Sequence, residues 1–276
     1  MTNNDIKTMQ LYQRPTRILA DLRAQGLGVG APLTVEALSR FDQLHYHGTD
    51  ALDVAISECG IHGGESVLEV GSGWGGCARY IANKTGTRVT AVELQSDYDQ
   101  IARDLTARVT LKGCVEHVNA DFLDLDLPEK EFDHAASWLA LFHIPHREAY
   151  LGKLHHTLKP GGFLFVEDLY LIQQPDPDEA DDFQQHLRPG SLIDREAYFA
   201  ALKHAGFDVV HLADMTADWT DFTVTRLQAF RDARSDYEAV HGREGYATIE
   251  IFYTKMAGYF ARGLVGGVRF AAVRRG

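Results

Sequence analysis

A glycine-rich stretch between a predicted strand and a predicted helix is the feature that points most directly to chemistry. Residues 69–76 read EVGSGWGG. Glycines at such a place let the backbone turn tightly and approach a ligand closely, and the first turn of the following helix offers unpaired N–H donors. Glu93 ends the next predicted strand 93 − 73 = 20 positions after Gly73. An acidic side chain there can accept hydrogen bonds from a ribose diol, so the stretch predicts a cofactor that contains a nucleoside.

Two cofactor classes fit this spacing. Gly71, Gly73 and Gly76 satisfy the G-x-G-x-x-G pattern of nicotinamide dinucleotide sites. Glu69 lies two positions before the first glycine, where a buried carboxylate would repel a pyrophosphate and would suit the ammonium group of S-adenosylmethionine. The sequence therefore favours S-adenosylmethionine. A nicotinamide-dependent oxidoreductase and a non-catalytic S-adenosylmethionine binder are the alternatives.

His143 is the candidate for catalysis. It follows a predicted strand at residues 132–141, and a doubly wound sheet places its ligands at the carboxyl ends of its strands. A histidine near its neutral pKa can take a proton from an ammonium nucleophile or orient it. The neighbouring histidines have no carboxylate partner at metal-ligand spacing, so no metal site is predicted.

Arg188 is the candidate to hold an anionic group of the substrate, because a guanidinium grips a carboxylate through two hydrogen bonds. No second cation stands near it in the sequence, which favours a single carboxylate over a phosphate. Aromatic side chains can offer their faces to an amine or sulfonium cation. The candidates for this role are Trp138, Phe142, Trp219, Phe222 and Tyr253.

The elements that position these residues follow the alternation of a parallel sheet with crossover helices. Strands are predicted at 66–70, 88–94, 115–120, 132–141, 162–170, 208–213 and, more weakly, 266–275. Helices are predicted to end at Gly86, to run from Ser96 or Asp97 to Gly113, and to occupy 194–204 and 217 to about 241. Residues 1–65 are expected to form helices that cap the sheet. Within the domain at 66–276, the polar segment at about 171–193 is expected to form a lid.

Composition limits the partners. The 276 residues contain 27 Lys+Arg against 39 Asp+Glu, and this net charge of −12 disfavours nucleic acids and anionic membrane surfaces. The three cysteines have no C-x-x-C spacing, which fits a reducing compartment. There is neither an apolar leader nor a run of apolar residues long enough for a membrane span, so a cytoplasmic location is expected.

At these motifs the sequence resembles the class I S-adenosylmethionine-dependent methyltransferases. Their E/D-x-G-x-G-x-G core matches Glu69, Gly71, Gly73 and Gly75, and the adenine motif matches residues 119–122. The resemblance implies that Asp121 accepts from the adenine amino group, that Phe122 covers the ring and that Glu93 binds the ribose. The cofactor site that it implies comprises Glu69, Gly71, Ser72, Gly73, Gly75, Glu93, Leu94, Asp121, Phe122, Ser137 and Trp138.

From about Phe41 onward the chain is similar to the branch that contains sarcosine, dimethylglycine and phosphoethanolamine N-methyltransferases. The matching parts are the segment around Tyr46 and residues 137–143, 158–162 and 190–192. This resemblance implies a seven-stranded sheet with an antiparallel last strand, and Tyr46 paired with His143 over the methyl group. Arg188, Phe142 and Trp219 would bind the substrate. The expected reaction is N-methylation of a small carboxylated amine; a thioether or hydroxyl acceptor is the alternative, and a homodimer is possible.

Overall fold

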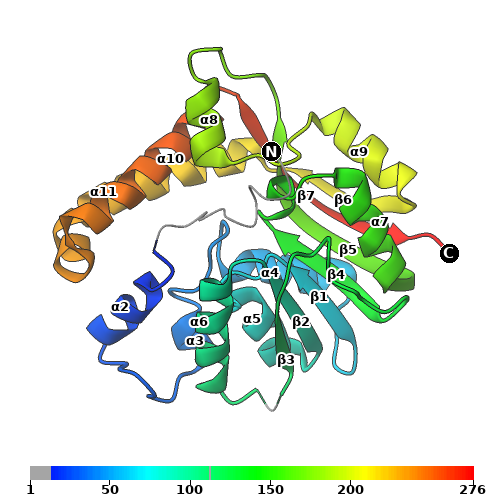
Figure 1. Ribbon diagram of the computed structural model, residues 1–276, viewed down its shortest axis with the longest axis horizontal. Coiled ribbons are helices and arrows are strands. Elements are labelled where there is room, and N and C mark those ends of the chain that lie inside the picture. Colours follow the sequence, from blue (N-terminus) through cyan, green and yellow to red (C-terminus); the bar gives the residue numbers. More distant parts are fainter. Residues whose placement is uncertain (1–13, 112) are drawn as a thin grey trace.

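Seven strands form one mixed sheet in the computed structural model, which describes residues 14–111 and 113–276. The strands are β1 (Ser66–Val70), β2 (Arg88–Glu93), β3 (Val115–Asn119), β4 (Phe132–Trp138), β5 (Leu158–Leu171), β6 (Phe207–Asp214) and β7 (Val265–Arg274). Their spatial order is β3-β2-β1-β4-β5-β7-β6 (Figure 1). The pairs from β3 to β5 are parallel, whereas β7 runs antiparallel to both β5 and β6. The predicted α/β doubly wound class, with its antiparallel last strand, is confirmed.

Helices cover both faces of this sheet because side chains alternate along each strand. Val67 faces α4 (Thr49–Cys59) and α5 (Gly76–Thr85), whose apolar residues share its cluster. The next residue, Leu68, faces α7 (Arg147–Thr157) and α9 (Arg195–His204) on the opposite side. The central strands are therefore buried on both faces, and a ligand must bind at their ends rather than on the sheet.

Most predicted boundaries agree with the structure, and four do not. Helix α5 ends where expected, with Gly86 in the left-handed conformation at φ 77°. Helix α6 (Ser96–Ala107) ends six residues before Gly113, because the chain turns at Arg108 and buries Val109 and Leu111 instead. Strand β5 begins at Leu158, before the Lys-Pro-Gly-Gly sequence that was expected to precede it.

Strand β4 is the second strand whose boundary was predicted wrongly. It ends at Trp138 instead of Leu141, because Leu139 adopts a left-handed φ of 53° and the chain enters a 3-10 turn at Leu141–His143. This early end matters for function. It brings His143 back across the carboxyl edge of the sheet.

The C-terminal part forms two long helices rather than one. Helix α10 (Thr216–Asp232) is followed by α11 (Arg234–Ala261), which extends twenty residues beyond the predicted end at about His241. Gly242 interrupts α11 with a φ of 73°. The pair projects from the sheet as a long arm whose far part lies close to α2 (Arg17–Ala24) (Figure 1).

The segment predicted as a lid contains a helix, α8 (Ala180–Leu187). Asp182 anchors it to α11, since its carboxylate accepts hydrogen bonds from Lys255 Nζ at 2.6 Å and from the Tyr259 hydroxyl at 3.0 Å. Closure of this segment over a substrate stays a prediction.

The described N-terminal helices belong to two neighbouring hydrophobic clusters. Helix α4 packs on the same face as α5, whereas α2 and α3 (Val35–Leu38) pack around Trp74 and α6. The predicted cap over residues 1–13 falls outside the described residues. Within the described ranges, every helix is too short or too polar to cross a membrane.

Candidate functional site

The glycine loop that follows β1 opens into a cavity at the carboxyl edge of the sheet, called here the strand-end cavity. Gly71, Gly73 and Gly75 have φ values of 80°, 53° and 73°, which is the left-handed region that favours glycine. A Cβ on Gly71 would collide with the Cβ of Ala140, and one on Gly73 would lie 2.9 Å from Leu44 Cδ1. Gly71 and Gly73 line the cavity, so these glycines hold the backbone open where a side chain would fill it.

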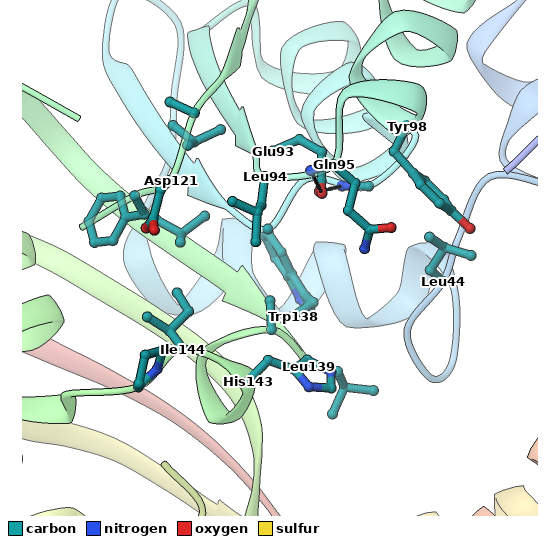
Figure 2. Close-up of a pocket in the computed structure, with 18 residues that line it drawn as sticks. Leu44, Glu93, Leu94, Gln95, Tyr98, Asp121, Trp138, Leu139, His143 and Ile144 are labelled. Atoms are coloured by element: carbon teal, nitrogen blue, oxygen red, sulfur yellow. Dashed lines mark hydrogen bonds between the residues drawn. The ribbon is translucent and has the colours of Figure 1, made fainter. Parts of the chain in front are cut away.

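Glu93 provides a rigid carboxylate at this cavity. Its oxygens accept hydrogen bonds from the backbone N–H groups of Gly73 at 2.7 Å and Gln95 at 2.8 Å (Figure 2). Burial raises the pKa of Glu93, and these backbone donors oppose that rise. A carboxylate has about four acceptor positions, so one already held by two donors can still accept from a ligand. The geometry fits the predicted contact with a diol.

Asp121 and Phe122 border the cavity on the side of β3 (Figure 2). Asp121 Oδ1 accepts from the Leu123 backbone N–H at 2.9 Å. Lys153 Nζ donates to the carbonyls of Phe122 and Leu123, both at 2.8 Å, and so fixes the turn. An acidic group and an aromatic ring thus stand where an adenine was expected. Together with Glu93 and the glycine loop, they fit a nucleoside-containing cofactor.

His143 lines the strand-end cavity and is held in one orientation. Its Nδ1 lies 3.0 Å from the carbonyl oxygen of Arg188. A carbonyl only accepts, so Nδ1 carries the proton and Nε2 keeps a lone pair. Burial lowers the pKa of His143 to about 4, which keeps the ring neutral at physiological pH. The side chain can therefore accept a hydrogen bond through Nε2.

The turn that carries His143 is fixed from below by a buried acid that sequence reasoning missed. Asp168 accepts from the Phe142 backbone N–H at 3.2 Å and from the Tyr198 hydroxyl at 2.8 Å. Burial raises the pKa of Asp168 to about 6, against the opposing effect of the nearby Arg147 guanidinium. Only its place near the end of β5 could have suggested this role.

Gly190 clamps the same turn from the other side. The backbone N–H groups of Gly190 and Ser191 both donate to the Phe142 carbonyl, at 2.9 and 3.0 Å. A Cβ on Gly190 would collide with the carbonyl group of His143. The segment at 188–191 and the His143 turn can therefore meet only through a glycine.

We expect Gly190→Ala to lower the free energy of unfolding by about 1–3 kcal/mol, because the added methyl group overpacks this contact. Chemical denaturation measures the change. Gly152→Ala is the matched control: Gly152 is in helix α7 with open space at its Cβ, so alanine there should stabilise by about 0.5–1 kcal/mol. Equal effects of the two substitutions would contradict the clamp.

Several predicted cofactor residues do not line the strand-end cavity. Leu94 and Trp138 line it, but Glu69, Ser72, Gly75 and Ser137 are not among its lining residues. Glu69 alternates with Val70 along β1 and so faces α4 and α5, near the Cys77 thiol. Burial raises the pKa of Glu69 to about 8. The contact of Glu69 with a cofactor stays a prediction.

Ser137 and Gly75 have structural partners instead. The Ser137 hydroxyl donates to the Val70 carbonyl at 2.8 Å and so ties β4 to β1. Gly75 makes room for the His117 ring, which a Cβ would meet at 2.5 Å. Contacts of these residues with a cofactor stay predictions.

A narrow space, called here the bridging cavity, lies beside His143 and shares the lining residues Leu44, Leu139 and His143 with the strand-end cavity. Tyr46 and Phe142 line it, so the structure brings both to the predicted catalytic histidine. Burial raises the pKa of Tyr46, which keeps its hydroxyl protonated. Trp219 is fully buried and meets the Tyr46 ring edge-on at 5.1 Å. It supports Tyr46 from behind and does not line the bridging cavity.

Arg188 lines a third space of about 310 Å³, called here the arginine cavity. Contrary to the expectation from the sequence, Arg188 is not alone. The basic residues that line this cavity with it are Arg14, Arg17, His186 and Arg226. No acidic side chain among the described residues lines it. His186 lies two positions before Arg188, but the three arginines come from separate parts of the chain, so inspection of the neighbours of Arg188 in the sequence could not find them.

The three cavities are neighbours that share lining residues. Arg226 lines both the arginine cavity and the bridging cavity, and Leu44 lines all three.

The comparisons with known proteins agree with this geometry. Residues 67–162 match the family model described as a methyltransferase domain. The chain is 31% identical over 172 residues to a sterol 24-C-methyltransferase of Neurospora crassa, covering 60% of this chain and 45% of that protein. It is 29% identical over 204 residues to phosphoethanolamine N-methyltransferase 1 of Zea mays, covering 73% of this chain and 40% of that protein. The chain thus spans less than half the length of these relatives.

A solved structure supports the fold. Phosphoethanolamine N-methyltransferase 2 of Haemonchus contortus, solved with phosphomonomethylethanolamine and S-adenosylhomocysteine, aligns with a TM-score of 0.81. The alignment covers all of this chain and 61% of that one, at 18% identity. The predicted resemblance to class I methyltransferases is confirmed at the level of this domain, and the nicotinamide-dependent alternative is disfavoured. The sarcosine-like acceptor is not established, because the relatives act on acceptors of different kinds.

Proposed function

We propose that this chain, whose residues 67–162 form a methyltransferase domain, transfers a methyl group from S-adenosylmethionine to a small acceptor that carries an anionic group. The observation that supports this most strongly is the neighbourhood of three cavities that share lining residues. The strand-end cavity offers groups for a nucleoside, His143 stands at its junction with the bridging cavity, and arginines line the space beyond.

S-adenosylmethionine supplies an electrophilic methyl group on a sulfonium. In this proposal Glu93 binds the ribose, Asp121 and Phe122 bind the adenine, and the glycine loop lies along the rest of the cofactor. The acceptor occupies the bridging cavity with its anionic group toward the arginines. Such confinement of two reactants can contribute about 7–11 kcal/mol to catalysis.

His143 orients the nucleophile rather than ionising it. With the pKa of His143 lowered to about 4, its Nε2 is a weak base and a good hydrogen-bond acceptor. It can hold the N–H of a neutral amine so that the nitrogen lone pair points at the methyl group. Tyr46, at the same cavity, can hold the other side of the acceptor.

Our leading acceptor is a carboxylated amine that is methylated on nitrogen. The arginine cavity also has room for a larger or more highly charged anion, and a thioether or hydroxyl nucleophile would use the same positioning. A cytoplasmic location, a homodimer and the absence of nucleic-acid and membrane partners stay predictions.

The test is formation of S-adenosylhomocysteine by the purified protein with separate acceptors. The panel holds carboxylated amines, phosphorylated amines, uncharged amines, thioethers and phenols. We expect turnover with anionic acceptors and none with their uncharged analogues. Turnover confined to thioethers or phenols would show that the methylated atom is sulfur or oxygen rather than nitrogen. Cofactor binding without turnover on any acceptor would favour the non-catalytic binder.

A further inference from the structure

Arg226 occupies a cage of aromatic rings beside the candidate catalytic histidine. Its guanidinium carbon lies 4.3 Å from the ring centre of Tyr253, 4.9 Å from that of Tyr46 and 5.2 Å from that of Phe222. The guanidinium also hydrogen-bonds to the Tyr46 hydroxyl. Aromatic cages of this kind are suited to binding cations. Here a cation of the protein itself already fills the cage.

Within residues 14–111 and 113–276, no acidic side chain shares the lining of the arginine cavity with Arg226. Its Nε is buried and has no hydrogen-bond partner among the described residues. Among the described residues, only arginine, histidine and uncharged side chains line the arginine cavity. This concentration of positive charge is notable in a chain whose net charge is −12. A half-buried guanidinium with an unused Nε donor favours an anionic partner.

We propose that Arg226 is a specificity-determining residue that makes the site select its acceptor by charge. Its guanidinium binds an anionic group of the acceptor close to the atom that is methylated. Because the guanidinium already occupies the aromatic cage, a cationic head group cannot bind there. This inference rests on the proposed function and deepens it. It predicts acceptors such as amino carboxylates, amino dicarboxylates or phosphate esters, and it excludes amines whose only charge is positive.

The physical basis is the competition between two cations for the same rings. A quaternary ammonium gains from ring faces only when they are accessible, and the three rings of the cage already face Arg226. A second cation would also lie near the first in a partly dry cavity, where like charges repel strongly. The same repulsion favours the unprotonated form of an acceptor amine, whose lone pair is then free to react.

Calorimetry with two simple probes tests the proposal on the full chain saturated with S-adenosylhomocysteine. The probes are malonate, a dicarboxylate, and tetramethylammonium, a cation without an anionic group. We expect the unaltered protein to bind malonate and to show no binding of tetramethylammonium. Arg226→Met keeps much of the side-chain volume and removes the charge. It should weaken malonate binding by about 10- to 100-fold and make tetramethylammonium binding measurable.

Two further variants separate a specific role from a general loss of charge. Arg226→Lys keeps the positive charge without the planar fork, so it should lose less malonate affinity than Arg226→Met and still refuse tetramethylammonium. Arg231→Met is the matched control on the same helix. Arg231 pairs with Glu250 at 2.9 Å on the surface and does not line the cavity, so both probes should behave as in the unaltered protein.

Malonate affinity unchanged in Arg226→Met, or tetramethylammonium binding of the unaltered protein equal to that of Arg226→Met, would overturn the proposal. A lack of malonate binding to the unaltered protein would also overturn it. Failure to bind S-adenosylhomocysteine would instead contradict the proposed function, and the preceding calorimetric titration with this nucleoside detects that outcome separately. If Arg226→Met does not fold, Arg226→Lys and the tetramethylammonium titration of the unaltered protein still decide the question.

Discussion

Glu93→Ala is expected to weaken binding of S-adenosylhomocysteine by about 1–3 kcal/mol, or roughly 5- to 150-fold in Kd. The ribose hydroxyls lose an acceptor that the backbone N–H groups of Gly73 and Gln95 hold in place. Those two donors also lose their partner, so the glycine loop itself becomes less ordered. Isothermal titration calorimetry measures the affinity.

Glu116→Ala is the matched control for Glu93→Ala. Glu116 is an exposed carboxylate on the neighbouring strand β3 and does not line the strand-end cavity. Its loss changes the net charge equally, so it should leave the affinity unchanged. An equal affinity for the unaltered protein and Glu93→Ala would refute the ribose assignment, provided that the circular dichroism spectra show both to be folded.

The second large effect is expected at His143. His143→Asn should lower kcat on the order of 100-fold, the lower part of the range for a positioned proton-transfer or hydrogen-bonding group. Asparagine retains a donor near the place of Nδ1, so the hydrogen bond to the Arg188 carbonyl can persist. It lacks an equivalent of Nε2. Steady-state kinetics with the acceptor identified by the panel measures kcat.

His143→Gln is the complementary variant, because its amide reaches toward the place of Nε2 and should restore part of the rate. Affinity for S-adenosylhomocysteine should change by less than a few-fold in both variants. If His143→Asn retains full kcat, the ring serves only to hold the segment at 188–191. That result would remove His143 from the list of groups that touch the acceptor.

The pH dependence of the rate provides an independent check. With the pKa of His143 lowered to about 4 by burial, the ring does not change its charge between pH 5 and pH 9. Because the pKa of His143 is lower in the folded protein than in the unfolded chain, the neutral ring contributes to the free energy of unfolding. This contribution is complete above the ordinary pKa near 6.5 and is lost as the pH falls toward 4. We therefore expect His143 to add no ionisation to the kcat/KM profile in this range, so that the profile keeps its shape in His143→Gln.

Spacing along the chain determined the cofactor side of the candidate site, because its residues lie at the ends of neighbouring strands. The glycines at 71 and 73 lie in a single turn after β1, and Glu93 and Asp121 end or follow the two next strands. Strands in a parallel sheet bring their carboxyl ends to one edge whatever the details of packing. For that reason spacing along the chain was enough to place these residues together, and His143 with them.

Strand alternation places Glu69 in a way that spacing did not reveal. Glu69 and Val70 are neighbours in β1, yet Val70 lines the cavity and Glu69 faces the opposite helices. The motif predicted an acid near the cofactor. The pleat determined which face that acid points to, and burial there raises its pKa to about 8.

Only the tertiary structure shows that the part of the site proposed for the acceptor is lined by arginines. Arg17 comes from α2, Arg188 from the end of α8 and Arg226 from α10, and nothing in the separation of these residues along the chain predicts that they share a cavity. Asp168 reaches the His143 turn in the same way, from a neighbouring strand. Short-range spacing fixes contacts within a turn or along one sheet edge, whereas contacts between distant elements depend on how those elements pack in three dimensions.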